Sequence, residues 1–253
     1  MINGMLEAAR GCLKEEIRMD VISNNLANAT GIGFKKDRIS FQQYLDQTET
    51  SEPETITEEG LERDPFLVSV DVDFSEGNIQ TTGNELDLAI TGDGFFKIAT
   101  PDGVRYTRKG NFTLDSDRNL VTQDGYSVMG KEGTINVPSN ISENNTGIAI
   151  SDQGLISVDG IQVGQLDIVT FDNKGVLVKE EKGLFRNDSD NPEVAISSDT
   201  SVKQGYVELS NVNVAEEMIN MIHSMRAFES YQKAIKSIDD LDNTAINQVG
   251  TLR

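Results

Sequence analysis

Two side chains could act as a catalytic nucleophile or base, because the chain has one histidine and one cysteine. His223 lies inside a predicted helix, two positions after the apolar Met221, so we expect it on the flank of that helix. Cys12 lies on the apolar side of a second predicted helix, where we expect a buried, inert thiol, because a reactive thiolate needs an exposed, electropositive setting. The two side chains could approach only if the helices pair. We therefore do not expect an enzyme.

Two loops begin like ligand-binding motifs. Asp115–Asn119 starts like a calcium loop, but Leu120 stands where the required glycine belongs and Tyr126 where the glutamate belongs. Gly92–Lys97 starts like a dinucleotide fingerprint, yet it lacks the third glycine and the following helix. The scattered acidic residues nearby are expected to be solvated: Glu85, Asp87 and Asp93. The sequence therefore predicts no metal and no cofactor.

The charge of the chain excludes several classes of partner. Its 42 acidic and 22 basic residues give a net charge of −20, which disfavours both nucleic-acid phosphates and anionic lipid. The one basic cluster, at Lys35, Lys36 and Arg38, is expected to be a solvated helix exit. Because of this acidic charge, we expect no nucleic-acid partner. No run approaches 18 apolar residues, so we also expect no direct membrane insertion.

The composition is lean for a single thick core. Of 253 residues, 37% are apolar and 6% aromatic, and tryptophan is absent. This suits an elongated protein with thin layers, or one that buries surface against other subunits. A single cysteine excludes an internal disulfide. Charged residues between Glu7 and Glu16 interrupt any signal-peptide core, so these rules indicate a cytoplasmic protein, although export routes without such a signal exist.

The region from Asn211 to Val249 predicts one long helix, of about 35 residues or roughly 50 Å. Its apolar residues alternate in steps of four and three, broken only at Gln232, which is the period of a coiled-coil seam. Ser210, Asn211 and Asn213 precede it as N-cap candidates. The methionines are expected to form a packing stripe rather than a metal site. The predicted seam comprises Val214, Met218, Met221, Met225, Phe228 and Ile235.

Residues 1–27 predict a second amphipathic helix, which is the natural partner for the first. Its seam is expected to include Leu6, Leu13, Ile17 and Val21. The two ends of the chain would then pair as a coiled coil, with the middle looped out. Further apolar residues, such as Ile219 and Ile222, lie beside the C-terminal seam, so we expect that helix to contact more than one neighbour.

The middle of the chain predicts strands. From Phe66 the apolar period changes to two, and turn signals recur about every ten residues, as in all-β domains. Pro101–Gly103 between two β-rich runs predicts a hairpin. An acidic, extended linker is expected over 41–65 and the all-β domain over 66–205. The fold class is therefore α+β, and the expected β-domain core includes Leu86, Leu88, Ile90, Phe95 and Phe96.

Three segments in order resemble the flagellar rod and hook protein family of bacteria. The first is Asn25–Lys35; the second is Asn84–Phe96 followed by Tyr106–Phe112; the third is Gln204–Val214, which runs into Glu217 and Met218. The similarity spans nearly the whole chain. The matching residues that we expect to serve assembly are Asn24, Asn25, Leu26, Asn28, Thr30, Gly33, Phe34, Lys35, Ser210, Asn211 and Asn213.

The resemblance implies a structural rod subunit of the flagellar basal body, in the periplasmic space. It implies export through the flagellar type III apparatus without a cleaved signal, and helical assembly with itself and with other rod and hook proteins. Residues 1–40 and 206–253 would then be tube helices inside, with the β domain outside. Val128–Ile135 looks more like proximal than distal rod members, whereas 137–200 departs from both patterns.

Two alternatives remain open at this point. One is a distal rod or hook subunit of the same family. The other is a binding module built on the β domain, with the paired helices as an oligomerisation stalk. We also hypothesise that Asn24, Asn25, Asn28 and Thr30 satisfy backbone groups at the end of the first helix and fix the angle at which the chain leaves it.

Overall fold

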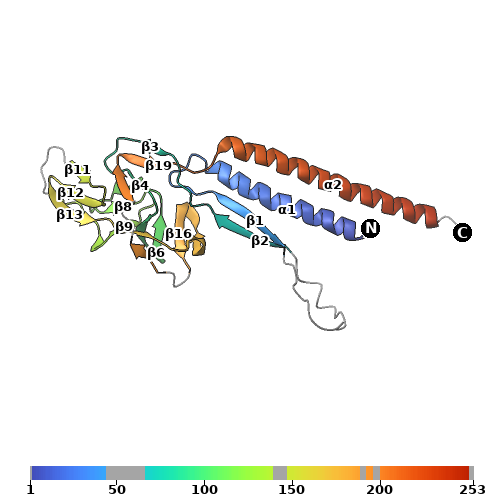
Figure 1. Ribbon diagram of the computed structural model, residues 1–253, viewed down its shortest axis with the longest axis horizontal. Coiled ribbons are helices and arrows are strands. Elements are labelled where there is room, and N and C mark those ends of the chain that lie inside the picture. Colours follow the sequence, from blue (N-terminus) through green and yellow to red (C-terminus); the bar gives the residue numbers. More distant parts are fainter. Residues whose placement is uncertain (1, 44–65, 139–146, 189–191, 196–199, 251–253) are drawn as a thin grey trace, which may run out of the picture. The chain divides into compact units, whose positions relative to one another are not determined.

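The computed structural model describes residues 2–43, 66–138, 147–188, 192–195 and 200–250. It has a helix at each end and a β-rich middle, so the predicted α+β class is confirmed (Figure 1). The chain divides into two compact units. Unit 1 comprises residues 1–23, 37–72 and 219–253, and unit 2 comprises 24–36 and 73–218.

Unit 1 contains most of the two helices, α1 (Ile2–Ala27) and α2 (Val214–Gly250), which lie side by side (Figure 1). Neither helix contains a proline, and Asn213 caps the start of α2, because its Oδ1 accepts hydrogen bonds from the backbone N–H groups of Ala215 and Glu216. Glu216 and Glu217 add negative charge where the helix dipole favours it. In the part of the chain that is described, no helix is long and apolar enough to cross a membrane.

The least exposed side chains of the two helices differ in part from the predicted seam, which stays a prediction. Leu6 and Leu13 of α1 are about half exposed, as are Val214, Met218 and Met225 of α2. The least exposed positions of α1 within unit 1 are instead Ala8, Glu15 and Ile22, and Ser224 is buried on α2. Ala8, Glu15 and Ile22 are seven residues apart and so form one row of α1, whereas Leu6 and Leu13 belong to another row. Ile17, Val21, Met221, Phe228 and Ile235 are partly buried.

Unit 1 also contains an antiparallel two-stranded ribbon, β1 (Asp37–Gln43) with β2 (Phe66–Val72). Residues 66–72 were expected to open the β domain, but they pair with β1 along their whole length. The alternation of apolar and polar residues revealed the strand without revealing its partner. The linker expected over 41–65 begins inside β1, and its residues 44–65 lie outside the described part of the chain.

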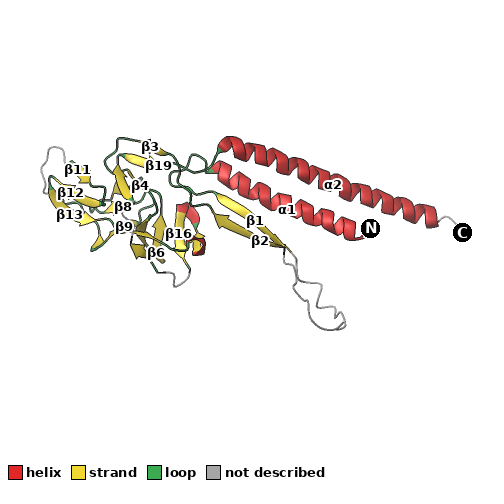
Figure 2. Cartoon of the chain, viewed as in Figure 1, coloured by secondary structure: helices red, strands yellow, loops and turns green. Residues whose placement is uncertain are grey.

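Unit 2 is built from short antiparallel strands (Figure 2). A ten-stranded sheet has the main order β15-β16-β6-β5-β9-β8-β7, with β10 on β9, and with β14 on β5 and carrying β17. A second sheet has the order β11-β12-β13, and two further pairs are β18-β4 and β19-β3. The predicted hairpin at Pro101–Gly103 is confirmed as the connection between β5 and β6. In described order these strands are β3 (Ile79–Thr81), β4 (Leu88–Thr91), β5 (Phe95–Thr100), β6 (Gly103–Thr107), β7 (Thr113–Leu114), β8 (Leu120–Val121), β9 (Ser127–Gly130), β10 (Gly133–Thr134), β11 (Ile148–Ile150), β12 (Leu155–Val158), β13 (Ile161–Gln165), β14 (Ile168–Thr170), β15 (Leu177–Lys179), β16 (Leu184–Asn187), β17 (Val194–Ala195), β18 (Ser201–Gln204) and β19 (Tyr206–Glu208).

The core of unit 2 lies between these sheets. Leu88, Ile90 and Phe96 belong to its main apolar cluster, and Leu86 packs against that cluster while partly buried. Phe95 is also buried, but it lies in a separate aromatic group with Phe74, Phe171 and Phe185. Ring centroids in this group are 5.2–6.1 Å apart, the spacing of edge-to-face and tilted aromatic pairs.

Candidate functional site

The segment that leaves α1 runs against the segment that enters α2. The backbone N–H of Gly33 donates to the carbonyl of Glu208 at 2.7 Å, and Ile32 forms an isolated β-bridge with Leu209. Leu209 in turn donates to the carbonyl of Asn78 at 2.8 Å. The first and third sequence motifs therefore meet in space. We call this meeting point, residues 31–36, 73–78 and 208–213 of unit 2, the junction.

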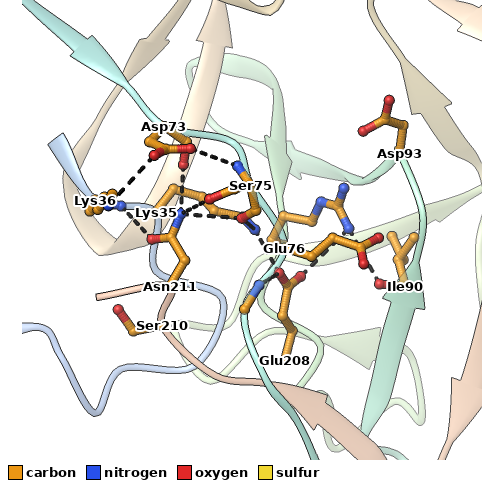
Figure 3. A network of polar contacts seen from close by, with 12 residues as sticks. Lys35, Lys36, Asp73, Ser75, Glu76, Ile90, Asp93, Glu208, Ser210 and Asn211 are labelled. Atoms are coloured by element: carbon orange, nitrogen blue, oxygen red, sulfur yellow. Dashed lines mark hydrogen bonds and ion pairs between the residues drawn. The ribbon is translucent and has the colours of Figure 1, made fainter. Parts of the chain in front are cut away.

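A buried charge cluster lies at the centre of the junction (Figure 3). The Nζ of Lys35 donates at 2.6 Å both to Oε1 of Glu208 and to the carbonyl of Ser75. A guanidinium nitrogen of Arg108 lies 3.5 Å from Oε2 of Glu208. The side chains of all three charged residues are at most 1% exposed. Two cations therefore share one carboxylate away from water.

Desolvation governs the electrostatics of this cluster. Burial lowers the pKa of Lys35, and the neighbouring Glu208 carboxylate opposes that change by favouring the charged ammonium. Burial lowers the pKa of Arg108 as well, again opposed by Glu208. Arg108 also donates to the carbonyls of Ile90 and Gly92, at 3.3 and 2.8 Å, so it ties β4 to the junction. The Glu208 carboxylate thus stabilises the charged forms of both buried cations.

Glycine lets backbones meet at two places in the junction. Gly33 has a φ of +64°, and a Cβ there would lie 2.5 Å from the backbone nitrogen of Lys109. A Cβ on Gly77 would collide with the carbonyl oxygen of Leu209. The N–H of Gly77 also donates to Oε1 of Glu208 at 2.8 Å, so the close approach serves the charge cluster directly.

Asn211, just before α2, connects its own segment to the segments that contain Lys36 and Asp73. Its Oδ1 accepts from the backbone N–H of Lys36 at 2.8 Å, and its Nδ2 donates to the carbonyl of Asp73 at 2.8 Å. The same Nδ2 lies 3.2 Å from the carbonyl of Ser75. Ser210 is buried, and its Oγ accepts from the N–H of Val212 at 3.2 Å. These side chains replace the backbone pairing that a regular strand would have.

The asparagines at the end of α1 behave partly as hypothesised. Asn28 Nδ2 donates to the carbonyl and to Oδ1 of Asn24, at 2.9 and 2.8 Å, in addition to the bond that the backbone N–H of Asn28 makes to the same carbonyl at 3.2 Å. Asn25 is buried, Leu26 is partly buried, and Thr30 is exposed. Phe34 is buried beneath the ammonium of Lys179, which lies 3.9 Å from the ring centroid and donates to the carbonyl of Lys35.

The residues with chemical potential elsewhere do not converge. His223 is exposed on α2 and Cys12 is partly buried on α1. The calcium-like loop is closed on itself, because Asp115 accepts from the backbone and side-chain nitrogens of Asn119 at 2.8 and 3.0 Å. Among the described residues, no three acidic, histidine or cysteine side chains group as metal ligands. Asp93 pairs with Lys174 at the surface.

Sequence reasoning missed two members of the charge cluster. Arg108 and Glu208 both fall inside the recognised motifs, but nothing distinguished them there as paired residues. The local pattern gave no signal, because Glu208 between Val207 and Leu209 fits the ordinary alternation of a half-buried strand, which predicts an exposed charge.

The geometry defines a structural protein, whose two long helices begin and end in one tightly bonded junction of a β domain. Family models agree along the chain. Residues 5–35 match the flagella basal body rod protein model, 89–158 the D1 domain of flagellar hook protein FlgE/F/G, and 203–248 the C-terminal model of flagellar basal body rod FlgEFG protein.

Whole-chain relatives point to the same group. The flagellar basal-body rod protein FlgG of Buchnera aphidicola subsp. Schizaphis graminum is 36% identical, with 95% of this chain and 97% of the relative covered. FlgG of Borreliella burgdorferi is 34% identical, with 98% of each covered. The flagellar basal-body rod protein FlgF of Caulobacter vibrioides is 31% identical, with 92% of each covered. The chain belongs to the flagellar basal-body rod protein family, and its role is that of a structural subunit of the rod.

Proposed function

We propose that this subunit polymerises helically through its terminal helices, which pair as a coiled coil, and that the resulting rod transmits torque. One observation supports this most directly. Large apolar side chains on α2 are about half exposed, whereas Ser224 on the same helix is buried. These exposed residues are Val214, Met218, Ile219, Ile222 and Met225.

Such an arrangement suits a helix that is completed by neighbours. Each fully buried Leu, Ile or Met side chain stabilises an interface by about 1.5–3 kcal/mol. On α1, Met5, Leu6 and Leu13 are exposed in the same way. A single chain therefore presents apolar rows on both helices, and packing these rows against adjacent subunits would form a tube with the β domain outside.

The junction supports one part of the proposed torque transmission. Lys35, Glu208 and Asn211 link the segment after α1, the segment before α2 and residues 73–75 by hydrogen bonds of 2.6–2.8 Å. Buried hydrogen bonds of this kind hold the segments that they join in a fixed arrangement. Within unit 2, the segment that follows α1 and the segment that precedes α2 are therefore held together by the junction.

Several finer features rest on family membership. We propose export through the flagellar type III apparatus without a cleaved signal, and assembly in the periplasm with copies of itself and with other rod and hook proteins. Neither nucleic-acid binding nor membrane insertion is part of the proposal. A proximal rather than distal position stays a prediction, because the relatives' names state no position. The domains are proposed as 1–40, 41–65, 66–205 and 206–253, except that residues 66–72 pair with β1 rather than with the β domain.

Dilution and nucleation separate this proposal from an oligomerisation stalk. A rod subunit should sediment as a monomer when dilute, and form filaments or rod stacks, visible by electron microscopy, when it is concentrated or nucleated. Replacing Met218 and Met225 by Gln should suppress the filaments. Val178→Thr, which changes an exposed apolar residue of the β domain, is the matched control. A small, fixed oligomer at all concentrations would instead establish the stalk.

A further inference from the structure

The inner faces of the two helices meet at a tyrosine and two glycines. Gly11 of α1 lies against the ring of Tyr231, and Gly4 lies against Ile238. From Gly11 to Gly4 is seven residues backward along α1 (11 − 4 = 7), and from Tyr231 to Ile238 is seven residues forward along α2 (238 − 231 = 7). Both contacts therefore follow one antiparallel register. Seven residues is the repeat that returns a side chain to the same face of a paired helix.

The two glycines differ sharply in how closely they are approached. A Cβ on Gly11 would lie 2.6 Å from Cε1, 2.7 Å from Cζ and 2.8 Å from Cδ1 of Tyr231. A Cβ on Gly4 would lie 3.7 Å from Cδ1 of Ile238, which is ordinary van der Waals contact. The ring of Tyr231, a residue that is 37% exposed, thus lies against Gly11 so closely that an added Cβ would require the ring to move.

We propose that Gly11 and Tyr231 are the positioning residues that set the register and closeness of the helix pair. This inference deepens the proposed function and rests on it, because the register decides which residues each helix leaves for neighbouring subunits. With the ring seated on Gly11, the row of Leu6 and Leu13 stays outside. A ring displaced from Gly11 would turn or shift α1 and move that row out of place.

Helix propensity makes the proposal unusually easy to test. Alanine forms helices better than glycine does, so both Gly11→Ala and Gly4→Ala should favour α1 if packing had no influence. We expect the two substitutions to differ instead. Gly4→Ala should assemble as the unchanged chain does, whereas Gly11→Ala should lose rod assembly, because the new methyl group displaces the tyrosine ring.

Register is measured by intramolecular cross-linking in the full-length chain. Cys12 is the chain's only cysteine, so a second cysteine introduced by Gln232→Cys gives one defined pair. Cys12 follows Gly11, and Gln232 follows Tyr231 on the antiparallel helix. Each is one residue, or about 1.5 Å, away from the Gly11–Tyr231 contact in opposite directions, so they are about 3 Å apart along the helix axis. A short bismaleimide reagent should join them within one chain, visible as a faster-migrating monomer on a denaturing gel.

The expected outcomes distinguish a register role from general destabilisation. Gly11→Ala should slow the cross-link several-fold, and Gly4→Ala should leave its rate unchanged. Tyr231→Phe keeps the ring and should behave as the unchanged chain. Tyr231→Ala removes the ring that lies on Gly11 and should also slow the cross-link, and adding Gly11→Ala to it should not restore the rate. Unaltered cross-linking and assembly of Gly11→Ala would overturn the proposal.

Failure of helix-mediated polymerisation and failure of the register role give different results. If the Met218→Gln and Met225→Gln chain forms filaments normally while Gly11→Ala still loses the cross-link, the register role stands and helix-mediated polymerisation does not. If Gly11→Ala, made in the Tyr231→Phe chain so that Tyr231 no longer contributes, alters the near-ultraviolet circular dichroism of the remaining tyrosines, the substitution acts on folding rather than on register, which also counts against the proposal.

Discussion

Neutralising Glu208 is the most direct test of the junction. Glu208→Gln keeps the shape of the side chain but leaves the Lys35 ammonium and the Arg108 guanidinium buried without a counter-charge. Breaking a buried ion pair from one side costs about 3–5 kcal/mol, because a charge is left uncompensated away from water. At about 2–4 °C per kcal/mol for a chain of this size, the melting temperature should fall by roughly 6–20 °C. Urea denaturation at neutral pH measures the free energy directly.

The pH dependence of that loss has a defined sign. Burial lowers the pKa of Lys35 below its usual value near 10.5, so between the folded and the unfolded pKa the unfolded chain binds more protons. Stability gained from this residue therefore rises with pH through that window. Removing the Glu208 charge removes the main influence that raises the pKa of Lys35, so the window extends to lower pH. The deficit of Glu208→Gln should shrink as pH rises from 7 towards 10.

Two further variants make the reasoning refutable. Lys35→Met added to Glu208→Gln removes one of the two buried cations that lack their carboxylate partner. The double variant should recover part of the lost free energy of unfolding. Glu180→Gln breaks a more exposed pair with Arg105 in the same domain and should cost no more than about 1 kcal/mol. A loss of stability in Glu208→Gln no larger than that in Glu180→Gln would contradict a buried ion pair at Glu208. A loss that grows as the pH rises would contradict it as well.

Three other substitutions test separate parts of the molecule. Replacing Asn25 and Asn28 by Leu should abolish rod assembly and motility, because the end of α1 loses its side-chain hydrogen bonds; normal swimming on soft agar would contradict this. Gly77→Ala should destabilise unit 2 by about 1–3 kcal/mol, as overpacking does, whereas Gly164→Ala, in open space, should not; equal denaturation midpoints would count against the close approach. Phe95→Ser should cost about 3–5 kcal/mol through loss of its aromatic contacts, measured by thermal unfolding, and an unchanged melting temperature would remove Phe95 from the core.

The sequence was enough to predict both helices and the β-rich middle, because their periods are local properties. It was not enough to choose between neighbouring rows of α2. Met221 and Phe228 are partly buried. Met218 and Met225, which precede them by three residues and lie in the neighbouring row of the helix surface, are exposed. A period of 3.5 identifies a seam, but a helix destined for several neighbours has apolar residues on more than one face.

The junction was harder to predict for a different reason. Lys35 and Glu208 are 173 residues apart in the chain, and Lys35 and the carbonyl of Ser75 are 40 apart. No local pattern links residues at such distances. The motifs told us which residues belong to the family, yet the pairing of their charges depends on how β19 and the segment after α1 come together in three dimensions.

The helices also explain why the lean composition is no defect. On α1 the least exposed positions include Ala8 and Glu15 beside Ile22, whereas Leu6 and Leu13 are about half exposed. In an isolated two-helix protein this arrangement would waste apolar surface, since burial of such side chains is the dominant favourable term in folding. Under the proposed polymerisation, the exposed Leu6 and Leu13 would instead be buried between subunits, and the contact of Gly11 with Tyr231 would set the register within one subunit.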